Sequence, residues 1–127
     1  LVYTGVRWHV RAWCEKNQEY RDFVLSRFRD IPEIMDDSQH GVEGDTEWNT
    51  LVRIRIVPDP RLSAEQRQVV EVDYGMTDGA LEVTTRGKLV PYALKLLHID
   101  PKEELDDPTA QQIVVQDREQ LQRWLFG

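Results

Sequence analysis

Polar and apolar side chains alternate along residues 7–14, the first strongly patterned stretch of the chain. His9 and Arg11 fall on one side of an extended backbone and Trp8 and Val10 on the other, because side chains of a strand alternate with period two. A short polar insert leads to a second run, EYRDFVLSRF, which is rich in aromatic and branched residues. The pattern predicts two strands joined by a polar turn, with Trp8 in the core and cationic and aromatic side chains together on the opposite surface.

A polar and acidic stretch follows and ends this pattern. Pro32 disfavours a continuing strand or helix, and residues 36–48 contain five acidic residues and no Lys or Arg. Runs of one charge are usually solvated connectors. We therefore expect a first part at 1–35, an acidic linker at 36–48 and a second part at 49–127.

The second part alternates strand-like and helical patterns. Ser63 followed three residues later by Gln66 is the pattern of a capping box at the start of a helix, and Asp78-Gly79 is typical of a hairpin turn. The predicted elements are a strand at 51–57, a short helix from Ser63, strands at 69–74 and 80–85, a helix at 89–98, a strand at 112–115 and a closing helix at 117–126. This order, βαββαβ with a terminal helix, predicts an α+β fold of ferredoxin-like type.

Composition and charge narrow the function. The chain has 127 residues and a net charge of −7, so it is a poor candidate for gripping duplex DNA through phosphates, and any DNA-reading part is expected outside it. No apolar run approaches the roughly 18 residues of a membrane span, so no membrane partner is expected. Cys14 is the lone cysteine, which suits a reducing cytoplasm. Because the chain starts without Met and mid-pattern, we expect it to be a piece of a longer protein.

Two phrases of the first part resemble the latter part of a WYL domain, a ligand-sensing module of bacterial transcription regulators. The family phrase G-x-R-W-Y-L-x-A-Y-C corresponds to GVRWHVRAWC at residues 5–14, and the family strand R-x-F-x-L-x-R corresponds to RDFVLSR at residues 21–27. His9 stands where Tyr is usual, and Val10 where Leu is usual. The resemblance implies an incomplete Sm/SH3-like β-barrel in the first part, and the second part is similar in element order and position to the WCX domain that often follows it.

The resemblance also implies a basic pocket that receives a nucleotide-like or short nucleic-acid effector. Arginine forks suit phosphate or carboxylate, and Trp13, Tyr20 or Phe23 offer rings on which bases stack. Taken without the resemblance, the same residues favour a solvated sheet face with surface ion pairs, and the resemblance reverses that preference. The expected ligand-binding residues are His9, which replaces the family Tyr, Arg21 and Arg27, which match the family arginines, and Arg7 and Arg11 as further candidates.

The resulting hypothesis is a non-enzymatic sensor, the ligand-sensing and dimerization region of a WYL-type regulator. It would form a homodimer, domain-swapped where exposed strand edges exchange, and reach operator DNA through an N-terminal winged helix-turn-helix outside this chain. The two phrases further resemble regulators beside phage-defence genes, most of which are repressors. The effector, the operator and the sign of regulation stay open.

Three other functions are weighed against the sensor. A pure interaction or dimerization module would leave the arginines as surface residues. A single-stranded nucleic-acid-binding domain fits both inferred folds, although the acidic charge disfavours it. An enzyme ranks last, because the sequence has no Gly-rich phosphate loop, nucleophile elbow or zinc-ligand spacing, and no cofactor or metal is expected.

Overall fold

The computed structural model describes residues 1–101 and 106–125 of the chain. It divides into two compact units, Leu1–Thr50 and Leu51–Gly127. Both units contain an antiparallel three-stranded sheet, and helices are interleaved with the strands of the second. The predicted α+β class is therefore confirmed.

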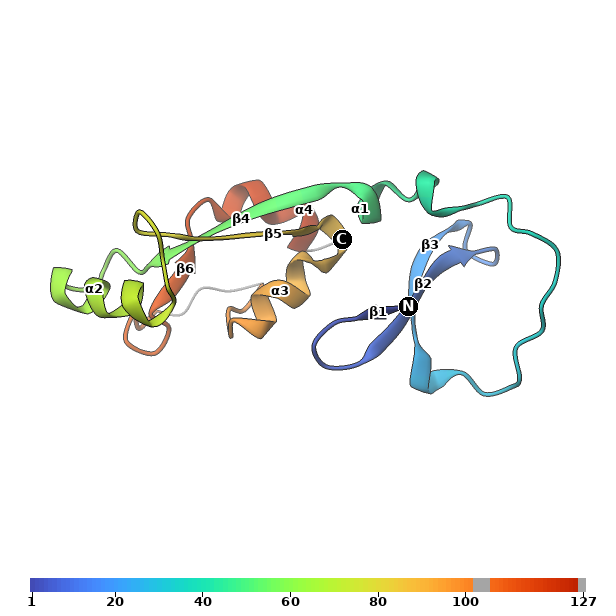
Figure 1. Cartoon of the computed structure of the whole chain (residues 1–127), viewed down its shortest axis with the longest axis horizontal. Coiled ribbons are helices and arrows are strands. Elements are labelled where there is room, and N and C mark those ends of the chain that lie inside the picture. The colour runs from blue at the N-terminus through green and yellow to red at the C-terminus, as the bar shows by residue number, and fades with distance from the viewer. Residues whose placement is uncertain (102–105, 126–127) are drawn as a thin grey trace. The chain divides into compact units, whose positions relative to one another are not determined.

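The first unit is built around a hairpin with one extra strand at its edge. Strands β2 (Trp8–Cys14) and β3 (Glu19–Val24) form the predicted hairpin, and β1 (Val2–Tyr3) pairs with the free edge of β2 (Figure 1). Gln18 in the connecting turn has a φ of 53°, the left-handed conformation that closes tight turns. The hairpin prediction is confirmed, and β1 was not predicted because two strand residues give too short a pattern to recognise.

Trp8 is not in the core, and its predicted burial is wrong. The register places Tyr3 of β1 directly opposite Trp8, and the two rings stack with their centroids 5.1 Å apart. Trp8 nevertheless remains 50% exposed. Aromatic partners across a strand pair stabilise each other on a sheet surface, so this ring finds its apolar contact without being buried.

The chain after β3 contains little regular structure but returns to the hairpin. A long connection without helix or strand joins the 3₁₀ turn η1 (Leu25–Arg27) to a second one, η2 (Val42–Gly44), which is followed almost at once by the helix α1 (Thr46–Asn49) (Figure 1). The contacts of residues 40–45 with β2 and β3, described below, lie inside the stretch predicted to be a linker.

In the second unit, β4 (Leu51–Pro58) lies between β5 (Leu81–Arg86) and β6 (Ile113–Val115), and both pairings are antiparallel (Figure 1). The helices are α2 (Ala64–Asp73), α3 (Val90–Leu96) and α4 (Gln122–Leu125), with 3₁₀ turns η3 (Gly87–Leu89) and η4 (Arg118–Leu121) before α3 and α4. The closing helix is thus confirmed as η4 and α4, and its predicted last residue, Phe126, lies outside the described residues.

The predicted strand at 69–74 is wrong, because these residues continue helix α2. The predicted capping box starts this helix: Gln66 N–H donates to Ser63 Oγ at 3.2 Å, and Ser63 N–H donates to Gln66 Oε1 at 2.9 Å. Of the valines in the run, Val70 is buried and Val69 and Val72 are exposed. β-Branched residues lower helix propensity by only a few tenths of a kcal/mol each, which the cap and the burial of Val70 offset.

The topology of this unit is therefore βαβαβ with a three-stranded sheet, and the predicted βαββαβ order is wrong by that one strand. The predicted turn at Asp78-Gly79 is present and leads into β5, with φ values of 54° and 76° at the two residues. Thr77 and Ala80 flank it as an isolated bridge. Two positive φ values are what a type I′ hairpin turn requires.

One hydrophobic core holds the second unit together. Ile54 and Ile56 lie on the same face of β4, since they are two residues apart, and both are at most 1% exposed. They pack with buried residues of all three helices and of β6. The buried members of this cluster are Ile54, Ile56, Leu62, Val70, Val90, Leu94, Ile99, Ile113, Val115, Leu121 and Leu125.

Candidate ligand-binding site

The register of β2 and β3 decides which side chains share a surface. Residues directly opposite in an antiparallel pair project from the same face. Three such pairs define one face, which we call the Arg11 face: His9–Val24, Arg11–Asp22 and Trp13–Tyr20. The other face of this hairpin carries the pairs Val10–Phe23, Ala12–Arg21 and Cys14–Glu19.

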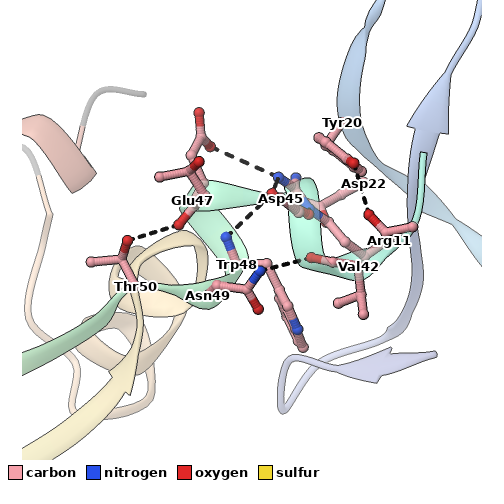
Figure 2. A network of polar contacts seen from close by, with 11 residues as sticks. Arg11, Tyr20, Asp22, Val42, Asp45, Glu47, Trp48, Asn49 and Thr50 are labelled. Carbon is pink, nitrogen blue, oxygen red and sulfur yellow. Dashed lines mark hydrogen bonds and ion pairs between the residues drawn. The ribbon is translucent and has the colours of Figure 1, made fainter. Parts of the chain in front are cut away.

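Arg11 is the polar centre of the Arg11 face and binds Asp45 as a fork (Figure 2). Its Nε donates to Asp45 Oδ2 at 2.7 Å and its Nη2 to Asp45 Oδ1 at 2.9 Å. The two side chains are only 7% and 3% exposed. Asp22 lies 3.5 Å from Nη1, and Glu47 lies 4.0 Å from Nη2. Three carboxylates therefore surround one guanidinium.

This surrounding charge affects the protonation of Arg11. Burial of the guanidinium by itself opposes the charged form, but the hydrogen bond with Asp45 and the negative charges of Asp22, Asp45 and Glu47 outweigh it, so the pKa of Arg11 is raised above its ordinary value. Arg11 thus remains a permanent cation. Any group that replaced Asp45 on it would have to accept hydrogen bonds from Nε and Nη2.

Asp45 is held in place by the turn that follows it. Its Oδ1 accepts a hydrogen bond from Trp48 N–H at 3.3 Å, which makes Asp45 the N-cap of α1. The Asn49 side chain donates to the Val42 carbonyl at 2.7 Å, and the Thr50 hydroxyl donates to the Thr46 carbonyl at 2.8 Å (Figure 2). The segment is therefore a small folded unit that presents Asp45 and, at 4.0 Å, Glu47 to Arg11.

An aromatic contact lies on the same face at Trp13, two residues after Arg11 on β2. The ring of His40 stacks on Trp13 with 3.8 Å between centroids and 10° between planes. Tyr20 meets Trp13 edge-on, with centroids 5.0 Å apart, and its hydroxyl donates to the Gly41 carbonyl at 2.8 Å. The segment at 40–45 therefore lies against the hairpin through one stacked ring, one backbone carbonyl and one carboxylate.

A cavity of about 220 Å³ adjoins these contacts. Its lining includes side chains of the hairpin and of the returning segment: Arg11, Trp13, Tyr20, His40, Asp45 and Trp48. It combines a cation, several aromatic rings and a carboxylate, which are the side chains that bind small ligands carrying both a ring and a charge. Among the described residues, no three His, Cys, Asp or Glu side chains gather as metal ligands do.

The structure brings together two of the five predicted ligand-binding residues, His9 and Arg11, on the Arg11 face. His9 is buried, at 5% exposure. Arg21 projects from the opposite face, where its Nε pairs with Glu19 Oε1 at 2.7 Å and its side chain stays half exposed. The remaining two are exposed: Arg7 precedes β2, and Arg27 ends η1.

Four contributors to this site, His40, Asp45, Glu47 and Trp48, were not predicted. All four come from the acidic stretch, whose composition indicates a solvated connector. A local signal exists only for Asp45, since an Asp three residues before Trp48 fits an N-cap. Nothing in the sequence pairs it with Arg11, which lies 34 positions earlier.

Two parts of the chain match known protein families. Residues 1–33 match the WYL domain, and residues 51–121 match the family described as "BrxR transcriptional regulator, C-terminal dimerization domain". The chain belongs to the BrxR family of transcriptional regulators. The predicted resemblance to a WYL-type regulator is therefore confirmed, and the second unit is the BrxR dimerization domain.

Relatives of this BrxR-family chain include proteins named DNA-binding transcriptional repressor CapW. The one from Stenotrophomonas maltophilia is 35% identical over 125 residues, which cover 98% of this chain and 42% of the relative. Those from Escherichia coli and Pseudomonas aeruginosa are 36% and 34% identical over 121 residues, which cover 95% of this chain and 40% of each relative. The chain thus spans about two fifths of the length of these relatives, which are repressors rather than enzymes. No helix in the described part of the BrxR-family chain has the length and apolar character needed to cross a membrane.

Proposed function

We propose that this chain is the effector-sensing and dimerization region of a transcriptional repressor. The match of residues 51–121 to a dimerization domain carries the proposal, together with the likeness to CapW repressors. The intact protein would be a homodimer, domain-swapped or not, that grips operator DNA through a winged helix-turn-helix preceding this segment. A role in phage defence and a cytoplasmic location belong to the same proposal.

The effector is proposed to be a nucleotide or a short nucleic acid, bound on the incomplete Sm/SH3-like barrel of the first unit. Arg11 supports this, because a buried guanidinium that binds carboxylate through two nitrogens suits phosphate equally well. Trp13 and Tyr20 provide rings for base stacking beside it. Arg7, Arg21 and Arg27, which are exposed, and His9 remain candidate contacts.

The test measures release of operator DNA by the intact regulator. Fluorescence anisotropy of a labelled operator is followed while the 5′-phosphorylated adenine dinucleotide is added to wild type, Arg11→Gln, the double variant Arg21→Ala/Arg27→Ala, and Arg29→Gln as an exposed-arginine control. We expect release with wild type and the control. Loss of release in Arg11→Gln places the effector on the Arg11 face, whereas loss in the double variant places it at the exposed side chains of Arg21 and Arg27.

A second function is favoured by the dimerization match itself. If the chain serves only to join two copies, the operator is bound with the same affinity with and without the dinucleotide in every variant. Sedimentation of the wild type would then show a dimer at all effector concentrations. A single-stranded nucleic-acid-binding role would instead give binding that tightens as the oligonucleotide lengthens.

A further inference from the structure

The returning segment makes two contacts on the Arg11 face that differ in chemistry and lie side by side. Trp13 and Arg11 are two residues apart on β2 and therefore project from the same face. His40 places a flat heteroaromatic ring on Trp13, at 3.8 Å between centroids. Asp45 places an anion on the fork of Arg11, at 2.7 and 2.9 Å. A ring on an aromatic side chain and an anion on an arginine are the two contacts that a nucleotide makes with a protein.

We propose that residues 40–45 occupy the effector site as an internal mimic of a nucleotide, with His40 in the place of the base and Asp45 in the place of the phosphate. This inference rests on the proposed function, since it assigns the ligand class and the regulation of that same site. A nucleotide effector would displace the segment, bind Trp13 and Arg11 itself, and so turn a self-occupied site into a liganded one.

The size of the remaining space supports displacement over simple addition. The cavity beside the segment is about 220 Å³, below the roughly 300–1,000 Å³ of pockets that enclose whole small ligands. A ligand that stacked on Trp13 where His40 does, and bonded Arg11 where Asp45 does, would have to take the positions of the His40 ring and the Asp45 carboxylate. These two contacts therefore become available to a nucleotide when the segment leaves.

The chain before the segment is suited to such a movement. Residues 28–41 contain no helix or strand, and all side chains from residue 28 to 40 are exposed. Displacement of His40 would therefore uncover little core. Exposed loops with few buried contacts are the parts of proteins that open at low cost.

Displacement would also act on the connection to the dimerization domain. Asp45 caps α1, and α1 ends at Asn49, two positions before β4 begins at Leu51. When Asp45 leaves Arg11, the short folded turn that leads into β4 loses its two hydrogen bonds to the Arg11 guanidinium. Effector binding would thus be linked to the state of this connection through the contacts of residues 40–45 with the hairpin.

Calorimetry on the intact regulator tests this, with 5′-AMP and the 5′-phosphorylated adenine dinucleotide as probes. Asp45→Asn removes the charge but keeps an N-cap acceptor of equal quality, and His40→Ala changes an exposed residue. Asp37→Asn and Gln39→Ala are the matched controls from the same exposed stretch. Amide exchange of β2 and β3 checks that the first unit of each variant is folded.

Asp45→Asn and His40→Ala are each expected to bind the probes about tenfold more tightly than wild type. The reason is that the affinity of a site that is open only part of the time is reduced by the fraction of time that it is open. The controls should match wild type. Equal affinity of wild type, Asp45→Asn and His40→Ala would overturn the inference and make the segment a structural strap. Absence of binding by a folded Asp45→Asn/His40→Ala double variant would also overturn it. The proposed function is tested separately by the operator-release assay, because that assay measures whether the wild-type regulator releases its operator when the dinucleotide is added.

Discussion

The dimerization domain offers a strict test of the core assignment through two leucines of one helix. Leu94 and Leu96 both lie in α3, but Leu94 is fully buried and Leu96 is 57% exposed. Changing each to Ala removes the same three carbon atoms and alters helix propensity equally. The main difference between the two variants is therefore the burial of the atoms that are removed.

The magnitude follows from the burial. Removing three carbons from a fully buried Leu94 loses about 2.4 kcal/mol of transfer free energy at roughly 0.8 kcal/mol per methylene, and the cavity raises the cost to about 3–5 kcal/mol. At Leu96 the loss should be below about 0.5 kcal/mol, as for other surface substitutions. Since about 1.4 kcal/mol is a factor of ten, the populations of the opened second unit should differ between the two variants by about sixtyfold or more.

Hydrogen exchange of β4 measures this difference without involving the first unit. Residues 51–58 form the central strand, whose amides exchange through opening of the whole unit. In Leu94→Ala they should exchange at least a hundredfold faster than in wild type, and in Leu96→Ala within about twofold. Equal acceleration in both variants at every protein concentration would refute the core assignment. A loss at Leu96 that depends on protein concentration would instead place Leu96 in the dimer contact.

Three further outcomes are expected. The pKa of Asp59 is lowered, first by side-chain hydrogen bonds from Arg61. The ionised carboxylate therefore stabilises the fold fully above about pH 4, and this contribution is lost as the pH falls through the folded-state pKa. Urea unfolding between pH 6 and pH 2 should show that Asp59→Asn loses less unfolding free energy on acidification than wild type does. The pKa of the Cys14 thiol is lowered, first by a hydrogen bond from the backbone N–H of Asn17. Iodoacetamide should therefore alkylate Cys14 at neutral pH faster than it alkylates the cysteine of an unstructured peptide. Denaturation of the protein should abolish this difference in rate. Ser63→Ala should cost about 1 kcal/mol and accelerate amide exchange in α2, with the first unit unchanged.

Local rules predicted most of the fold. The capping box at Ser63 and the turn at Asp78-Gly79 are formed as their residue types require, because a cap and a type I′ turn depend on a few neighbouring residues. The strand predicted at 69–74 failed for the opposite reason. A run containing Val69, Val70 and Val72 has strand propensity, but the start of α2 and the core position of Val70 were already set by contacts that the run itself does not encode.

The site was predictable only in part. Alternation along β2 correctly placed His9, Arg11 and Trp13 on one face. It gave no register for β3, and pairing with Ala12 puts Arg21 on the other face. The ion pair of Arg11 with Asp45 joins segments 34 positions apart in the sequence. The charge composition of a segment does not indicate which distant residue it will contact, so this pair could not be predicted.

The energetics of the Arg11–Asp45 pair bear on which role it has. Both side chains are almost completely buried, and taking two charges out of water offsets most of their mutual attraction, so such a pair is often no more stabilising than two apolar residues. Stability alone therefore gives little reason for this ion pair. The free-energy change differs when one anion on Arg11 is exchanged for another. Removing Asp45 without replacement would be costly, because the guanidinium would lose two hydrogen bonds. Replacing Asp45 by a phosphate would leave the guanidinium bonded by a fork of the same geometry. The free energy separating the self-occupied and liganded states would then be small, which is the condition under which an effector of modest affinity shifts a population.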